Sequence, residues 1–201
     1  MYLLKHSIFR IIAVNFGLIF AAQIQIPIGI ISITCHTIAL MLSAYLMRRS
    51  EVLIGFLLYC LEATAGFPVL AGWIADSTWY FSGRVGFFLG FPIAVWFTSQ
   101  WKFKAKNFWQ KCYVFFIAHL IILSTGVLGI TFKAGLLQAL NNGFFPILIP
   151  AIIKTILLAS ISQMHSNYLL KAIIPSEIEE ALTLKTLNSK GISPSTKAMS
   201  K

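Results

Sequence analysis

The sequence is poor in charged residues, and especially in acidic ones. Only 11% of its 201 residues are charged, and six Asp and Glu stand against sixteen Lys and Arg. Soluble globular domains carry about 25% charged residues, so most of the surface of this chain is not expected to face water. Hydrophobic residues make up 58% of the chain, and the mean hydropathy is +0.81. The composition therefore indicates an integral membrane protein.

Cysteines are also few, and the motifs of several enzyme classes are missing. Cys35, Cys60 and Cys112 are an odd number without metal-ligand spacing, which favours neither a disulfide framework nor a zinc site. The sequence contains no glycine-rich phosphate loop and no Walker-type lysine motif, so the chain is not expected to hydrolyse ATP itself. We expect no catalytic residue, no metal and no cofactor. Residues 1–23 lack a clean small-residue cleavage site and are interpreted as a first membrane span, not as a signal peptide.

Six long apolar runs are present, and a helix needs about 20 apolar residues to cross a bilayer. They cover residues 8–24, 30–47, 52–72, 80–101, 112–132 and 144–164. This pattern predicts an all-α membrane domain over residues 1–171, built as a bundle of six transmembrane helices. The segment 172–201 is rich in Ser, Thr and Lys, which predicts a cytoplasmic tail that is partly disordered.

The basic residues predict how the chain is oriented in the membrane. Thirteen of the sixteen lie in alternate connections or in the tail, namely Lys5, Arg10, Arg48, Arg49, Lys102, Lys104, Lys106, Lys111, Lys171, Lys185, Lys190, Lys197 and Lys201. Because Lys and Arg accumulate in cytoplasmic loops, both termini are predicted to be cytoplasmic, on the same side as six spans require. We expect a multi-pass protein of the cell (inner) membrane, surrounded by the lipid bilayer. The charges form no single basic face, which argues against nucleic acid as a partner.

Charged residues inside the apolar runs are functional candidates, because they are costly in a membrane. Lys154 lies in the middle of the sixth run, Glu62 deep in the third and Arg84 near the start of the fourth. Lys154 is about ten residues from either end of its run, or roughly 15 Å of helix, too far for its side chain to reach water. It is interpreted as a partner of Glu62 or as a fixed cation for a ligand carboxylate. Glu62 either neutralises a cation or accepts hydrogen bonds from ligand N–H groups.

The first apolar run carries a small residue at every fourth position. Ala13, Gly17 and Ala21 form a smooth stripe that allows another helix to approach closely. Such a stripe suits packing inside the bundle, and it also suits docking of a separate membrane partner.

Several stretches resemble the BioY family, the biotin-specific S components of energy-coupling-factor (ECF) transporters. The strongest is 59–72, Tyr-Cys-Leu-Glu-Ala-Thr-Ala-Gly-Phe-Pro-Val-Leu-Ala-Gly, which is similar to the family's Tyr-Leu-x-x-Gly-x-x-Gly-Leu-Pro-Val-Phe-Ala-Gly. Residues 33–37 and 86–91 resemble two shorter family segments. The spacing from Pro146 to Lys154 resembles the ends of the family's Pro-Phe-x-x-x-Asp-x-x-Lys. Together the resemblance covers roughly residues 25–158.

The resemblance implies a six-helix protein that binds biotin near the extracytoplasmic face and catalyses no bond-making. It also implies docking on a transmembrane coupling subunit and two cytoplasmic ATPase subunits, with the stripe of Ala13, Gly17 and Ala21 as the docking face. Lys154 matches the family position that meets the ligand. The predicted ligand-binding residues are Lys154, Glu62, His36, Thr34, Tyr59, Trp73 and Arg84.

Three departures from the family pattern affect the predicted site. The family's acidic residue three positions before the lysine is Ala151 here, the glutamine of the early motif is His36, and a Gly-Pro-Thr-Gly turn reads Ser-Gly-Arg-Val at 82–85. The ureido ring of biotin carries N–H donors that need an acceptor. We expect Glu62 to supply this acceptor in place of the missing acid, with His36 or Thr34 helping.

Two other functions stay open. The first is binding of a different small vitamin, since the departures from the family pattern alter the predicted site. A metal ion as cargo is disfavoured, because His36 and His119 have no local partner at ligand spacing, and His119 is expected to make a helix–helix hydrogen bond. The second function is that of an intramembrane enzyme that acts on lipid or isoprenoid substrates. Such enzymes usually have clustered acids at membrane depth, whereas Glu62 stands alone.

Overall fold

The structure is a computed structural model that describes residues 2–28, 31–83 and 85–173. Arg84 and nearly all of the predicted tail at 172–201 lie outside these residues. The chain divides into two compact units, Met1–Ser162 and Gln163–Lys201. The described part of the second unit continues as helix to Ile173. All further contacts below belong to the first unit.

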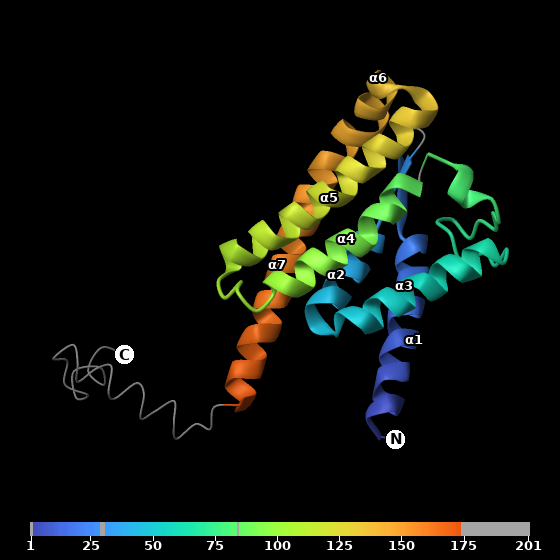
Figure 1. The fold of residues 1–201 in the computed structure, drawn as a ribbon. Coiled ribbons are helices and arrows are strands. Elements are labelled where there is room, and N and C mark those ends of the chain that lie inside the picture. Colours follow the sequence, from blue (N-terminus) through green and yellow to red (C-terminus); the bar gives the residue numbers. More distant parts are fainter. Residues whose placement is uncertain (1, 29–30, 84, 174–201) are drawn as a thin grey trace, which may run out of the picture. The chain divides into compact units, whose positions relative to one another are not determined.

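Helices make up most of the described chain, which confirms the predicted helical membrane architecture (Figure 1). The six long helices are α1 (Tyr2–Gln23), α2 (His36–Leu46), α3 (Arg49–Thr64), α4 (Val85–Trp101), α5 (Phe108–Ala134) and α7 (Phe145–Ile173). A short α6 (Leu136–Ala139) and a π-helical turn, η2 (Leu140–Phe144), join α5 to α7. Three stretches are long and apolar enough to cross a membrane, namely His6–Gln23, Phe108–Ala134 and Leu136–Tyr168.

Three helices are shorter than the apolar runs predicted, including α4, which begins at Val85 instead of near residue 80. The strands β1 (Gln25–Ile28) and β2 (Ile31–Thr34) pair antiparallel, so α2 begins at His36 instead of near residue 30. The segment is rich in isoleucine, which favours extended backbone. Helix α3 ends at Thr64 instead of continuing to residue 72. Gly66 takes a φ of 87°, and Pro68 follows, so the apolar stretch after α3 forms a loop with a short 3₁₀ turn, η1 (Trp79–Phe81).

Glycine lets α4 and α5 pack with their backbones close together. The two helices run side by side in Figure 1 and are in extensive contact. A Cβ atom placed on Gly86 would lie 2.9 Å from the Cα of Gly129, and one on Gly90 would lie 2.9 Å from the Cα of Ile122. Close approach of this kind is typical of membrane helices with small residues at their interface.

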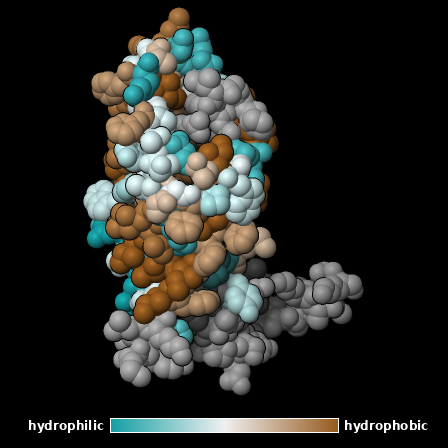
Figure 2. All heavy atoms as spheres, turned by 90° about the vertical axis from the view of Figure 1, so that its right-hand side faces the viewer, coloured by the Kyte–Doolittle hydropathy of each residue, from teal (hydrophilic) through white to brown (hydrophobic). Residues whose placement is uncertain are grey.

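The surface carries the apolar side chains that a lipid environment requires. Brown and tan areas cover much of the face in Figure 2. Phe103 and Phe132 are 81% and 88% exposed. Large contiguous apolar surfaces are rare on soluble monomers, so this surface agrees with a multi-pass membrane protein.

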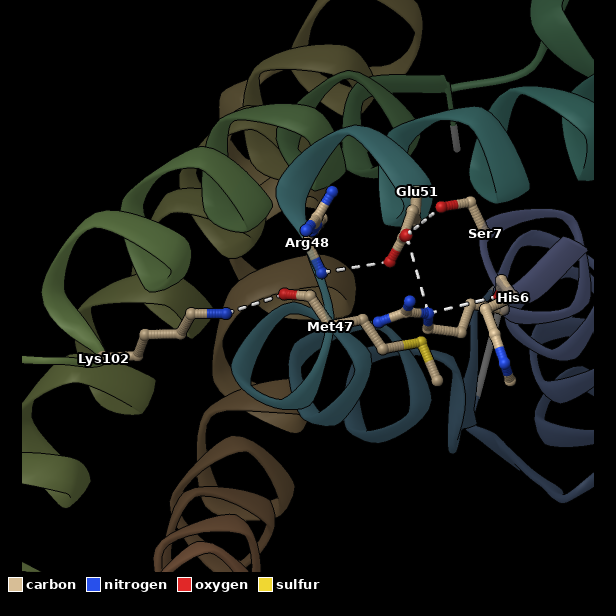
Figure 3. A network of polar contacts seen from close by, with 7 residues as sticks. His6, Ser7, Met47, Arg48, Glu51 and Lys102 are labelled. Atoms are coloured by element: carbon tan, nitrogen blue, oxygen red, sulfur yellow. Dashed lines mark hydrogen bonds and ion pairs between the residues drawn. The ribbon is translucent and has the colours of Figure 1, made fainter. Parts of the chain in front are cut away.

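A polar network centred on Glu51 connects the start of α3 to α1 (Figure 3). The Glu51 side chain is buried, and its Oε1 accepts a hydrogen bond from Ser7 Oγ at 2.8 Å. Its Oε2 accepts one from the Arg48 backbone N–H at 3.3 Å. The Arg10 Nε atom lies 3.5 Å from Oε1 and completes an ion pair. Each oxygen of this buried carboxylate therefore has a partner.

Lys102 connects the end of α4 to the end of α2 beside this network (Figure 3). Its Nζ donates to the backbone oxygens of Met47 at 2.7 Å and Ala44 at 3.0 Å. Burial lowers the pKa of the Lys102 ammonium group from its ordinary value. Together with the Glu51 network, this contact brings the beginning of α1, the α2–α3 junction and the end of α4 to one end of the first unit.

Candidate functional site

A cavity of about 430 Å³ lies between the β-hairpin, the loop after α3 and the helices α2, α3, α4, α5 and α7. Small-molecule sites in proteins occupy about 300–1,000 Å³ and combine apolar walls with a few polar groups. This cavity has both features. Neither the hairpin nor the loop after α3 continues the helix that precedes it. Both segments therefore contribute residues to the lining.

Lys154 contributes a cation to the lining of the cavity. It lies on α7, and its Nζ donates to the Thr34 backbone oxygen at 2.5 Å and lies 3.3 Å from Thr37 Oγ1. Both threonines also line the cavity. Among the described residues, no carboxylate lies within ion-pair distance of Lys154. An uncompensated cation in a low-dielectric site attracts an anionic ligand group strongly.

Two histidines bring further polar atoms to the lining. His36 begins α2, and His119 lies in the middle of α5; both side chains are buried. The Nδ1 atom of His119 lies 2.9 Å from the Phe115 backbone oxygen and 3.1 Å from Thr155 Oγ1. The Nε2 atoms of both histidines are buried without a hydrogen-bond partner in the described part of the chain.

Aromatic rings form an apolar wall that reaches His36. Tyr59 stands edge-on to His36 at a centroid distance of 5.0 Å and stacks on Phe88 at 6.2 Å. Phe88 in turn contacts Trp79 at 4.5 Å and Phe91 at 5.5 Å. All five side chains line the cavity. Such a wall suits a ring or an alkyl chain of a ligand.

The loop after α3 is anchored over the cavity by Gln23, at the end of α1. The Gln23 Nε2 atom donates to the backbone oxygens of Val69 at 3.4 Å and Leu70 at 3.3 Å. Its Oε1 accepts a hydrogen bond from the Trp73 backbone N–H at 2.8 Å. The Tyr59 hydroxyl adds a bond to the same Val69 oxygen at 3.2 Å. These contacts hold Leu70 and its neighbours in the lining.

Four of the seven predicted ligand-binding residues line the cavity together: Lys154, His36, Thr34 and Tyr59. Glu62 is not part of the lining. Its Oε2 accepts a hydrogen bond from Asn15 Nδ2 on α1 at 3.0 Å. The acceptor that we expected from Glu62 must therefore come from elsewhere in this arrangement.

The other predicted ligand-binding residues do not line the cavity in the described structure. Trp73 is exposed, with a positive φ of 57°, and contributes only its backbone N–H to the anchoring of the loop. Arg84 lies outside the described residues.

The small-residue stripe on α1 has both open and covered positions. Ala13 is exposed, and no atom lies within 4 Å of a Cβ placed on Gly17. Ala21 is buried in the bundle. The last position of the stripe therefore packs inside the first unit, whereas its first two positions are not covered by other residues of that unit.

Several residues of the cavity were not predicted as ligand-binding. His119 was expected only to contact a neighbouring helix, and it does approach Thr155 of α7. The rings of Phe88 and Phe91 lie in the segment 86–91, whose resemblance to the family was the available signal. Trp79 gave no signal in the sequence, because it lies in the predicted connection before the fourth apolar run. Among the described residues, no three His, Cys, Asp or Glu side chains are grouped as they would be around a metal ion.

Comparisons with known proteins agree on one family. The sequence model described as "BioY family" matches residues 4–171. "Biotin transporter BioY2" of Lactococcus lactis subsp. cremoris (strain MG1363) is 31% identical over 142 residues, which is 68% of this chain and 76% of that protein. "Probable biotin transporter BioY" of Rickettsia prowazekii (strain Madrid E) is 28% identical over 141 residues, or 70% of this chain and 72% of that protein.

A solved structure has the same fold. It is described as the crystal structure of the S-component for biotin from an ECF-type ABC transporter. The match has a TM-score of 0.69 at 18% sequence identity, and it covers 81% of this chain and 92% of the solved one.

Proposed function

This chain belongs to the BioY family, and from this premise we propose that it is the substrate-binding membrane component of an ATP-driven importer that captures biotin. The chain would bind the vitamin and would make no covalent bond to it. Its role is transport and not enzymatic catalysis, in keeping with its family.

The observation that carries the proposal is Lys154 in an aromatic-lined cavity of about 430 Å³. Biotin has a carboxylate, an apolar valeryl chain and a bicyclic ring with a ureido group. The Lys154 ammonium group suits the carboxylate, and the wall of Tyr59, Trp79 and Phe88 suits the apolar parts. Hydrogen bonds to Thr34 and Thr37 orient the ammonium group in the cavity.

The distribution of charge supports capture from the extracytoplasmic side, with both termini in the cytoplasm. Arg10, Arg48 and Lys102 lie near the Glu51 network and the end of α2. Cationic connections favour the cytoplasmic side of the inner membrane. The hairpin and the loop after α3, which line the cavity, belong to the connections that contain few cations. The cavity would then face outward.

Partner subunits follow from the proposed function. An importer of this class needs a transmembrane coupling subunit and cytoplasmic ATPase subunits, because this chain contains no ATP-binding motif. The uncovered positions Ala13 and Gly17 on α1 suit close approach of a helix from the coupling subunit. Ala21, which is buried, would stabilise the bundle instead.

The alternative ligand is another small vitamin. It is favoured by Ala151, which is buried in the lining where the resemblance led us to expect an acidic side chain. A ligand with a carboxylate but without a ureido ring would still suit Lys154.

Calorimetric titration of the detergent-purified chain tests the proposal. Wild-type protein should bind one biotin, and Lys154→Ala should weaken binding by at least about 30-fold, since truncation of one partner of a buried charge pair costs about 2–5 kcal/mol. Lys133→Ala, at an exposed position of α5, is the matched control and should bind as the wild type does. The methyl ester of biotin, which has no carboxylate charge, should bind the wild-type protein about as weakly as biotin binds Lys154→Ala. Absence of binding in folded wild-type protein would reject biotin as the ligand.

A further inference from the structure

Two histidines that line the cavity each have a buried nitrogen atom without a hydrogen-bond partner among the described residues. These atoms are the Nε2 atoms of His36 and His119, whose side chains are 6% and 5% exposed. Buried polar groups in folded proteins almost always have a hydrogen-bond partner, because an unmade bond is costly. Both histidines line the same cavity, and their unpaired atoms point to a ligand with complementary polar groups.

The surroundings of His119 determine which ring nitrogen carries the proton. Nδ1 lies 2.9 Å from the Phe115 backbone oxygen, and a carbonyl oxygen can only accept a hydrogen bond. A bare Nδ1 would place two lone pairs against each other, so Nδ1 carries the hydrogen and donates it. In the neutral ring, Nε2 is then an unprotonated acceptor. This assignment rests on hydrogen-bond geometry.

The position of His119 relative to α7 explains what this acceptor replaces. Thr155 approaches Nδ1 at 3.1 Å, and Ala151 lies one helical turn before Thr155 on the same face of α7. Ala151 lines the same cavity and is buried. An acidic side chain at position 151 would therefore reach toward the space beside the His119 ring. With alanine at this position, the His119 imidazole offers an acceptor in place of the acid.

We propose that His119 Nε2 accepts a hydrogen bond from an N–H group of the bound ligand, and so selects a ligand with a ureido-type ring. The inference rests on the proposed function and deepens it. Lys154 would bind the carboxylate at one part of the ligand, and His119 would bind the ring at another. Glu62, which is hydrogen-bonded to Asn15 away from the cavity, has no part in recognition.

The first arm of the test uses variants of the full chain and calorimetry. His119→Phe keeps a ring of similar shape but removes the acceptor, and it should weaken biotin binding by about 10- to 100-fold. His165→Phe, at an exposed position of α7, is the control and should bind as the wild type does. Adding Ala151→Asp to His119→Phe should recover at least about tenfold, since it returns an acceptor to the same space. Wild-type affinity in folded His119→Phe would overturn the inference while the proposed function stands.

The second arm varies the ligand, so it does not depend on the variant alone. Biotin methylated on each ureido nitrogen in turn has lost one N–H donor. For one of the two derivatives, the loss of affinity relative to biotin should be about tenfold larger in the wild type than in His119→Phe. A merely structural role of His119 would not produce this difference. Equal losses in both proteins for both derivatives would contradict the inference.

The third arm reads the tautomer directly in the wild type. The chain has four histidines, so ¹⁵N NMR of histidine-labelled protein is simple, and the spectrum of His119→Phe assigns the His119 signals. We expect a protonated Nδ1, and an unprotonated Nε2 whose signal shifts when biotin saturates the protein. A protonated Nε2, or an unprotonated Nε2 that does not respond to bound biotin, would overturn the inference. Failure of the wild type to bind biotin at all would instead remove the proposed function on which it rests.

Discussion

Two buried polar regions of this protein differ in how completely their atoms are paired. Around Glu51, each carboxylate oxygen accepts a hydrogen bond, from Ser7 or from the Arg48 backbone, and Arg10 adds an ion pair. Around the cavity, the Nε2 atoms of His36 and His119 have no partner in the described chain. A complete network stabilises the fold by itself, whereas an incomplete one leaves binding free energy for a ligand. Burial of polar groups alone therefore does not identify a functional site, and the unpaired atoms are more informative.

The difference predicts opposite effects of mutation in the two regions. Removing a member of the Glu51 network should destabilise the protein and leave ligand affinity unchanged. Removing an unpaired atom of the cavity should weaken ligand binding and leave the empty protein equally stable or more so. Removing the contacts that hold the loop after α3 should affect mainly the rate at which ligand leaves.

Glu51→Ala should have the largest effect on stability. It removes the acceptor of two hydrogen bonds and the partner of Arg10, and it should lower the free energy of unfolding by about 2–4 kcal/mol. Unfolding in detergent, followed by the fluorescence of the five tryptophans, measures the change. Biotin affinity of the folded fraction should stay at the wild-type value.

Glu62→Ala is the control for Glu51→Ala. The Glu62 carboxylate is only half-buried and accepts one hydrogen bond, from Asn15, so its loss should cost about 0.5–1.5 kcal/mol. An equal or larger loss for Glu62→Ala would show that the completeness of the Glu51 network does not determine its contribution.

Gln23→Ala should have an intermediate effect, expressed in kinetics. The Gln23 amide makes three bonds to the loop after α3, to Val69, Leu70 and Trp73. Without them the loop should open more often, and biotin should dissociate about 10- to 30-fold faster, which corresponds to about 1.4–2 kcal/mol. Displacement of labelled biotin by excess unlabelled biotin measures the rate. Gln138→Ala, at an exposed position of α6, should leave the rate unchanged, and an unchanged rate in Gln23→Ala itself would show that the loop is not held by these bonds.

The sequence was sufficient for the helices and for part of the site. Composition and apolar runs predicted the helical membrane fold, because these properties are local. The errors at residues 30–34, 65–72 and 80–83 have one cause: hydropathy measures apolarity and not backbone conformation. Gly66 and Pro68 carried the conformational signal for the second segment, yet their apolar neighbours outweighed it.

The pairing of polar residues was not predictable from the sequence. Lys154 and His36 were identified because a polar residue in an apolar run is conspicuous by itself. The Glu62–Asn15 and Ser7–Glu51 pairs join residues 47 and 44 positions apart, and no spacing rule connects them. His119 was visible as a polar residue, but only its contact with Phe115 indicates which of its nitrogens carries the proton.

His36→Phe should have a smaller effect on stability than Glu51→Ala, and with the opposite sign. The phenyl ring keeps the edge-on contacts with Tyr59 and Phe91 and removes the buried Nε2 atom that has no partner. Replacing an unpaired polar atom by an apolar one should raise the free energy of unfolding of the empty protein by about 1 kcal/mol. Biotin should bind more weakly, because one polar contact is lost and the larger ring occupies part of the cavity. Unfolding with and without saturating biotin measures both effects in one experiment. A loss of stability in the empty protein would mean that His36 is a structural residue, and the contrast between the two polar regions would then rest on His119 alone.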